Sequence, residues 1–213
     1  ELDDAFGTGG LAKADFGVSP APYSSTPLEM DMNSDGSLIV FGAYRTEEDG
    51  NQELIVAKYT ADGQPNPGFG DSGVSKIHRG VSDLRVGPGG LIYTTGLDFV
   101  DGMYAPSVTR FGADGHLDTS YGPDSNGTAL ADPSGFGPTT IGIADHLVVE
   151  PSAAAILSGS MVNSGFSTFT KKLNPEGLPV TVPGEPRLMT EVTSGGNLIS
   201  IKGPLILDVV NPG

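Results

Sequence analysis

The sequence predicts an all-β repeat domain, a β-propeller of four-stranded antiparallel blades, and three observations predict it. Glycine (32 residues) and proline (17 residues) recur at matched places along the 213-residue chain, and the longest stretch free of both is 51–62. Turn sequences alternate with short apolar runs rich in β-forming residues. Two sequence boxes each occur four times along the chain, and a third occurs three times. We therefore expect about sixteen short strands, four per repeat, and no helix longer than about three turns.

An aromatic residue followed by glycine marks the start of each of the first three repeats. The pairs lie 63 and then 52 residues apart, each inside a turn-rich box, and the second and third aromatic residues follow a turn glycine by six residues. The pairs are Phe6 and Gly7, Phe69 and Gly70, and Tyr121 and Gly122. We expect the three aromatic side chains to occupy equivalent buried positions between neighbouring blades, because they stand at the same place in the repeat.

Two further boxes supply the strands. One is a turn followed by an apolar run that ends in glycine, at 34–42 and 88–96, with weaker copies at 151–159 and 195–203. The other is an alternating run that ends in a turn, at 55–63, with counterparts at 107–115, 169–177 and 205–213. In the first repeat the predicted strands are 10–16, 28–33, 37–44 and 53–60. A single domain, 1–213, is thus divided approximately into repeats 1–63, 64–115, 116–177 and 178–213.

The boxes "LDDAFGTGG", "NSDGSLIVFG" and "VAKYTADG" resemble the delta-60 repeat, a bacterial β-propeller repeat. The resemblance covers nearly the whole chain and is best in the first two repeats. The fourth repeat departs from it, because "LPVTV" at 178–182 replaces the aromatic–glycine box. The resemblance implies a propeller fold and an extracellular, cell-surface or periplasmic setting in a bacterium. It implies no activity, since fold alone does not define function.

Composition excludes several classes of function. The net charge of −15 repels phosphate, so nucleic acid and anionic membranes are not expected as partners. No run of 18 apolar residues occurs, which excludes membrane insertion by a helix. The absence of cysteine excludes thiolate zinc sites, iron–sulfur clusters and cysteine catalysis. We expect no cofactor, with a structural calcium ion as the one exception kept open.

The candidate calcium ligands are Asp31, Asn33 and Asp35, which match the opening of a calcium-binding loop. Such a loop needs a bidentate acid at its twelfth position, where this sequence has Gly42. Asp35 and Gly36 also form an ordinary hairpin-turn sequence. The segment therefore has two interpretations, a calcium site and a plain turn, and the turn is favoured.

No catalytic residue is predicted. The three histidines have no pairwise spacing typical of a zinc site, and no nucleophile elbow accompanies the serines. Four aromatic residues in or near longer loops could stack on sugars or cover blade edges. The histidines are His78, His116 and His146, and the aromatic residues are Tyr23, Tyr44, Tyr104 and Phe136.

The sequence favours a non-catalytic binding or scaffold module that presents its loops (17–27, 45–52, 97–104 and 132–145) to a protein or glycan partner. The alternative is a polysaccharide hydrolase or lyase with its site at the propeller axis, and a third possibility is a structural segment of a larger surface protein. The ring itself has two possible forms. Four blades close on themselves, with the chain ends within roughly 15 Å, and this form is favoured because it leaves no exposed sheet edge. Otherwise the chain is part of a larger ring, completed by another copy through self-association or by further sequence.

Overall fold

The computed structural model describes residues 2–13, 24–45, 47, 50, 52–77, 80–100, 103–131, 141–162, 166–180, 189–192, 198–201 and 207–210. The chain divides into two compact units. Unit 1 comprises residues 1–79, 89–92 and 111–117, and unit 2 comprises 80–88, 93–110 and 118–213. Each unit is described by itself below.

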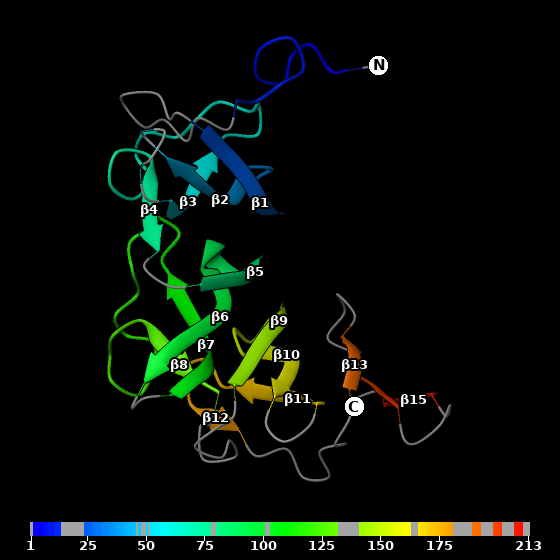
Figure 1. Ribbon diagram of the computed structural model, residues 1–213. Coiled ribbons are helices and arrows are strands. Elements are labelled where there is room, and N and C mark those ends of the chain that lie inside the picture. The colour runs from blue at the N-terminus through cyan, green and yellow to red at the C-terminus, as the bar shows by residue number, and fades with distance from the viewer. Residues whose placement is uncertain are drawn as a thin grey trace. The chain divides into compact units, whose positions relative to one another are not determined.

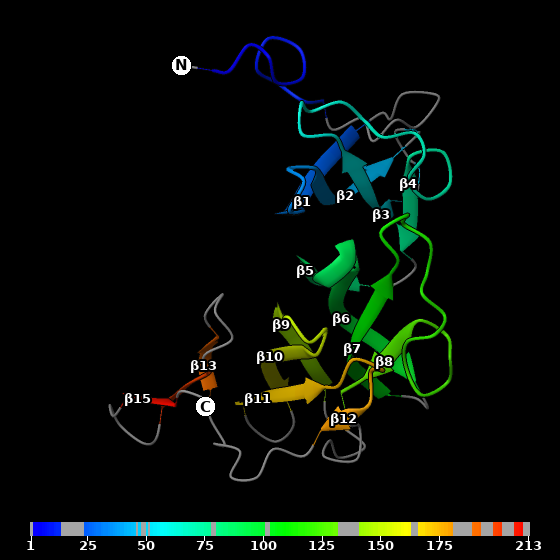
Figure 2. The ribbon, with the colours of Figure 1, turned by 180° about the vertical axis from the view of Figure 1, so that it is seen from behind.

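The described residues form fifteen strands and one 3-10 helix, η1 (Pro88–Gly90), so the all-β prediction is confirmed. Within that part of the chain, no helix is long and apolar enough to cross a membrane. The strands form three four-stranded sheets and one three-stranded sheet, each with its strands in chain order. The three four-stranded meanders can be followed by label in Figures 1 and 2.

Sheet 1 is the four-stranded meander of unit 1. Its register places Met30 opposite Val40, Leu38 opposite Tyr59, and Ala57 opposite Val74. These residues share one face, because side chains on paired positions point to the same side of a sheet. The strands are β1 (Ser24–Met32), β2 (Leu38–Arg45), β3 (Glu53–Tyr59) and β4 (Val74–Ile77).

The other three sheets repeat this order. Sheet 2 consists of β5 (Gly80–Val86), β6 (Ile92–Val100), β7 (Met103–Phe111) and β8 (Thr128–Leu130). Sheet 3 consists of β9 (Ile141–Val149), β10 (Ala155–Val162), β11 (Phe166–Leu173) and β12 (Pro179–Val180). Sheet 4 has three strands in the described residues, β13 (Met189–Val192), β14 (Leu198–Ile201) and β15 (Leu207–Val210).

The sheets are offset by one strand from the repeats that the sequence predicts. The fourth strand of sheet 1, β4, follows the second aromatic–glycine box, and β8 likewise follows the third. The predicted first strand, 10–16, is not a member of sheet 1, and only residues 10–13 of it are described. The second and third boxes therefore lie between the third and fourth strands of a sheet, because the chain turns there and returns to pair with the strand before it.

Glycine ends the apolar run of β6 and β10 for a steric reason. In sheet 3 the register slips between Ser158 and Gly159, which leaves an extra residue, a β-bulge, in β9. The bulge brings the Ile143 carbonyl oxygen so close to Gly159 that a Cβ atom there would overlap it. Gly96 is in the same position against the Gly80 carbonyl oxygen. A side chain at either site would displace the first strand of its sheet.

The core of unit 1 occupies both faces of sheet 1. On one face Val40, Ile55, Tyr59 and neighbouring residues form a hydrophobic cluster. On the other, Ile39 and Phe41 are equally buried. A strand that is apolar on both sides is stable only when both faces are covered, which is why β2 reads as a nearly continuous hydrophobic run.

Candidate functional site

The three aromatic–glycine pairs have the same geometry. In each box the glycine N–H donates to the carbonyl of the residue just before the next turn glycine, and the aromatic ring lies against that turn glycine. A Cβ atom on Gly115, for example, would lie 2.7 Å from Cζ of Phe69. The three hydrogen bonds join Gly7 N to Asp62 O (2.7 Å), Gly70 N to Asp114 O (2.7 Å) and Gly122 N to Glu176 O (2.9 Å).

Burial of the three rings is unequal. Phe69 is 1% exposed and Tyr121 is 0% exposed, but Phe6 is only half-buried. The structure therefore brings the three residues to equivalent places against turn glycines, and only two of them are fully buried.

The sequence analysis missed a side-chain turn inside each box. Asp3, Asn66 and Asp118 each accept, at 3.0 Å, a hydrogen bond from the backbone N–H two residues later. Such turns fix the backbone just before the aromatic residue. The signal was present in the sequence, since an Asp or Asn stands three residues before every one of the three rings.

A buried arginine in unit 2 was also missed. Arg110 is 8% exposed, and its guanidinium donates to Asp118 at 2.8 Å and to the Pro175 carbonyl at 2.5 Å. It also lies over the Tyr121 ring, 4.4 Å from the centroid. Burial raises the pKa of Asp118, but hydrogen bonds from Ser120 and the charge of Arg110 outweigh it, so the pKa is lowered. This cluster holds the third box against the turn that contains Pro175.

The three candidate calcium ligands are used by the β1–β2 turn. Asp35 accepts hydrogen bonds from the backbone and side chain of Ser37, which lower its pKa. Asn33 is buried and donates to Ser37, while Asp31 accepts from the Met32 N–H. Among the described residues, no three His, Asp or Glu side chains gather as metal ligands would. The geometry is that of a hairpin turn. Calcium binding by these residues is tested by the chelator titration described below.

The other candidates are described one by one. His116 and His146 are exposed, and His78 lies outside the described residues. Tyr44 is buried and donates to Glu53 at 2.7 Å; burial and this hydrogen bond raise its pKa. Tyr104 is half exposed and its ring contacts that of Phe99. Tyr23, Phe136 and most of the loops proposed for binding lie outside the described residues.

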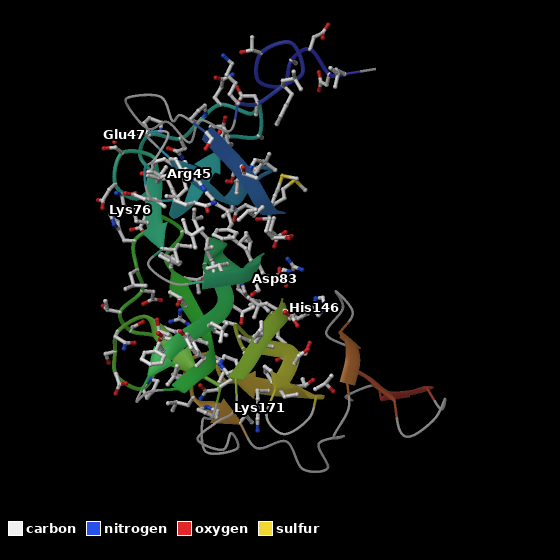
Figure 3. All side chains as sticks on the ribbon, in the orientation of Figure 1. Arg45, Glu47, Lys76, Asp83, His146 and Lys171 are labelled. Carbon is white, nitrogen blue, oxygen red and sulfur yellow. The ribbon has the colours of Figure 1, made fainter. Side chains whose placement is uncertain are left out.

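Asp83 of β5 joins two sheets inside unit 2. Its carboxylate accepts the Leu147 N–H of β9 at 2.7 Å and pairs with Arg85 at 2.6 Å, while the side chain is almost completely buried. Figure 3 shows Asp83 next to His146 of β9. Because the Asp83 oxygens are occupied by these partners, the residue positions β5 against β9 and has no sign of a catalytic role.

Unit 1 contains an open apolar groove of about 520 Å³. One wall is the N-terminal segment 10–13, held by a hydrogen bond from the Tyr59 hydroxyl to the Lys13 carbonyl at 3.0 Å. The other wall is the face of sheet 1 that carries Leu28, Met30 and Leu38. We call this cavity the sheet-1 groove. Its described lining includes one carboxylate, Glu29, and is otherwise mainly aliphatic.

These features define an all-β repeat protein built from four-stranded antiparallel meanders, the form of propeller blades. Residues 33–69 match the family "Domain of unknown function (DUF5122) beta-propeller", which supports a β-propeller repeat family. Among solved structures, the chain is similar to an endo-1,4-beta-xylanase from Bacteroides thetaiotaomicron VPI-5482, with 17% identity and a TM-score of 0.40. The similarity covers 84% of this chain and 57% of the xylanase chain, so this chain spans little more than half of it. No curated protein matches the sequence.

Proposed function

We propose that the chain is a non-catalytic binding and scaffold module of a bacterial surface, secreted or periplasmic protein. The proposal combines the β-propeller repeat with the resemblance of its boxes to the delta-60 repeat. In this proposal the sheets belong to a propeller ring, either closed by four sheets or completed by another copy. Residues 1 and 213, whose separation would distinguish these forms, lie outside the described residues.

The sheet-1 groove is the observation that carries the proposal. It is open to solvent and lined mainly by aliphatic side chains on a rigid sheet, and exposed apolar surface of this kind is typical of a protein-binding site. Glycoside hydrolysis needs two carboxyl groups about 5–9.5 Å apart. The described lining of the groove offers one, Glu29, so the groove supports binding better than hydrolysis.

Two measurements on the whole chain test this function. Affinity electrophoresis with soluble polysaccharides, and cross-linking to purified envelope proteins, should detect a partner whose binding is weakened by Leu28→Lys. Leu28 is 52% exposed, so this change should leave the fold intact. Release of reducing sugar from any polysaccharide, abolished by Glu29→Gln, would instead support the hydrolase or lyase alternative.

Calcium is not required by the proposed function. Titration with a chelator, followed by thermal unfolding, should leave the midpoint unchanged. A large loss of stability would identify a structural calcium ion, with Asp31 and Asp35 the first residues to replace.

A further inference from the structure

The turn between the third box and β8 carries a sequence motif that the proposed function does not use. Asn126, Gly127 and Thr128 form the chain's one Asn-x-Ser/Thr sequence in which x is not proline, the acceptor motif for N-linked glycans. Asp124 stands two residues before the asparagine, an arrangement that bacterial oligosaccharyltransferases also recognise. The motif is short, so the structure around it has to show whether it can function.

The turn presents the acceptor side chain of the motif. Within unit 2, which contains the whole turn, Asn126 and the three residues before it are exposed, while Gly127 is buried with φ of 78°. The Asn126 side chain uses its Oδ1 atom, which accepts the Thr128 N–H at 3.0 Å. Its Nδ2 atom, to which a glycan is attached, takes part in no hydrogen bond among the described residues. A sugar on Nδ2 therefore leaves every described hydrogen bond of the turn in place.

Thr128, by contrast, is enclosed once the chain has folded. It is 7% exposed, and its hydroxyl lies 3.1 Å from that of Thr109, its partner across β7 and β8. Gly122 approaches so closely that a Cβ atom there would overlap the Thr128 carbonyl. The transferring enzyme has to bind the hydroxyl of the Ser or Thr in the motif. The folded chain thus offers the asparagine but hides the threonine, so transfer has to come before β8 pairs with β7.

We propose that Asn126 is an N-glycosylation site that is modified before β8 pairs with β7. The donor is an oligosaccharide linked to a polyprenyl diphosphate, and the catalyst is an oligosaccharyltransferase. The Asn126 Nδ2 atom forms a bond to C1 of the first sugar, while the bond between C1 and the diphosphate oxygen breaks. The polyprenyl diphosphate leaves with the electron pair, and Nδ2 gives up one proton. The proposal rests on the surface, secreted or periplasmic setting of the proposed function, where such donors are used.

Export of the 213-residue chain through an added leader tests the site, in a periplasm that holds a bacterial oligosaccharyltransferase and its lipid-linked oligosaccharide. Intact mass should show one added oligosaccharide on the wild type. Asn126→Gln should remove the added mass, and Thr128→Ser should retain it. Asp124→Ala should lower the modified fraction. An exported wild type without added mass, or added mass that persists in Asn126→Gln, would overturn the proposal.

Two variants separate the motif from the stability of the fold. Thr128→Val and Thr109→Val each remove one hydroxyl from the same hydrogen bond, but only Thr128→Val destroys the motif. Thr128→Val should therefore abolish the modification, and Thr109→Val should be modified like the wild type. Equal modification of the two variants would show that the motif is not what the enzyme reads.

The order of modification and folding is tested with purified, unmodified chain. When the same enzyme and donor are added after folding, this chain should gain much less oligosaccharide than chain modified during export, because Thr128 is enclosed. Equal modification after folding would contradict the proposed order. Thermal unfolding of the modified chain should give the midpoint of the unmodified chain, and a lower midpoint would show that Asn126 Nδ2 is not free in the fold.

The glycan and the proposed binding function fail separately. Binding is measured with unmodified chain, through a partner that Leu28→Lys weakens, and it does not depend on Asn126. A missing glycan would therefore leave the binding result as it stands, and a missing partner would leave the added mass unchanged.

Discussion

Sheet 1 and sheet 3 have the same strand order and the same bulge in their first strand, yet they bury equivalent residues differently. Met30 is 60% exposed, whereas Leu147 is 1% exposed. Both are apolar residues at the same register position in the first strand of their sheet. The difference teaches that burial at this position depends on a neighbouring sheet. In unit 2, β5 is that neighbour.

The aromatic–glycine boxes repeat this lesson on a smaller scale. Phe6 and Phe69 lie against turn glycines in the same way, and their glycines make the same hydrogen bond. Only Phe69 is fully enclosed. The local geometry of the boxes is therefore the same. The burial of each ring, and with it the stability that the ring contributes, depends on the side chains around it.

The largest expected effect is a difference in stability between variants of the first and second boxes. Phe69→Ala should lower the free energy of unfolding by about 3–5 kcal/mol, because it empties a fully enclosed aromatic site. Phe6→Ala should cost about 1–2 kcal/mol, since part of the ring is already in water. Urea denaturation of both variants measures this difference. Equal losses would mean that Phe6 is as enclosed as Phe69.

The two sheets should differ almost as much. Leu147→Ala should cost about 3 kcal/mol, through lost burial and the cavity left behind. Met30→Ala should cost less than about 1 kcal/mol, because most of its side chain is in water. A loss of stability as large as that of Leu147→Ala would mean that Met30 is enclosed in the folded chain.

Tyr121 offers a smaller test within unit 2. Its hydroxyl is buried and makes no hydrogen bond in the described structure, whereas the equivalent residue of the second box is Phe69. Tyr121→Phe should therefore stabilise the protein by about 1 kcal/mol, since an unsatisfied buried polar group is removed. The control is Tyr44→Phe, which removes a hydroxyl that is bonded to Glu53 and should destabilise.

The same variant should change the response to alkaline pH. Burial raises the pKa of Tyr121 well above its ordinary value. Below about pH 9 the neutral form is present in both folded and unfolded chains, because the ordinary pKa of tyrosine is about 10. Above that pH the unfolded chain loses the proton first, so stability falls as pH rises. Tyr121→Phe should lose less stability than the wild type between about pH 10 and 11, and parallel curves would contradict the assignment.

The smallest expected effect lies in the first turn of sheet 3. Ala153 has φ of 69°, a left-handed conformation that Gly36 and Gly90 adopt in the corresponding turns. Ala153→Gly should stabilise the protein by about 1 kcal/mol, because glycine takes this conformation without a steric penalty. The reverse change, Gly36→Ala, should destabilise by a similar amount. Thermal unfolding of the two variants should show shifts of opposite sign.

Much of the fold could be predicted because short sequence patterns specify it. Turn glycines such as Gly63 and Gly115, the apolar run of β2 and the aromatic–glycine boxes each impose structure within a few residues of themselves. Because the same patterns recur along the chain, each of them supports the same prediction more than once. The DUF5122 beta-propeller match, at residues 33–69, covers this same stretch of turn, two strands and box.

Less of the candidate site could be predicted from the sequence. No residue pattern near Arg110 predicts that its guanidinium donates to the Pro175 carbonyl, 65 residues later. The carboxylates proposed as calcium ligands accept hydrogen bonds from residues at the β1–β2 turn. The groove arises because the segment 10–13 lies across sheet 1, and no motif in that segment predicts it.

The sequence by itself determined the class of fold, the turns and the equivalence of the three boxes. These depend on backbone conformations that glycine, proline and aspartate favour over short distances. Only the tertiary structure decided that β4 belongs to the sheet before its box, that Leu147 is covered, and that Met30 is exposed. Pairing and burial depend on which distant strands come into contact, and the free energy of those contacts is spread over residues that no local pattern connects.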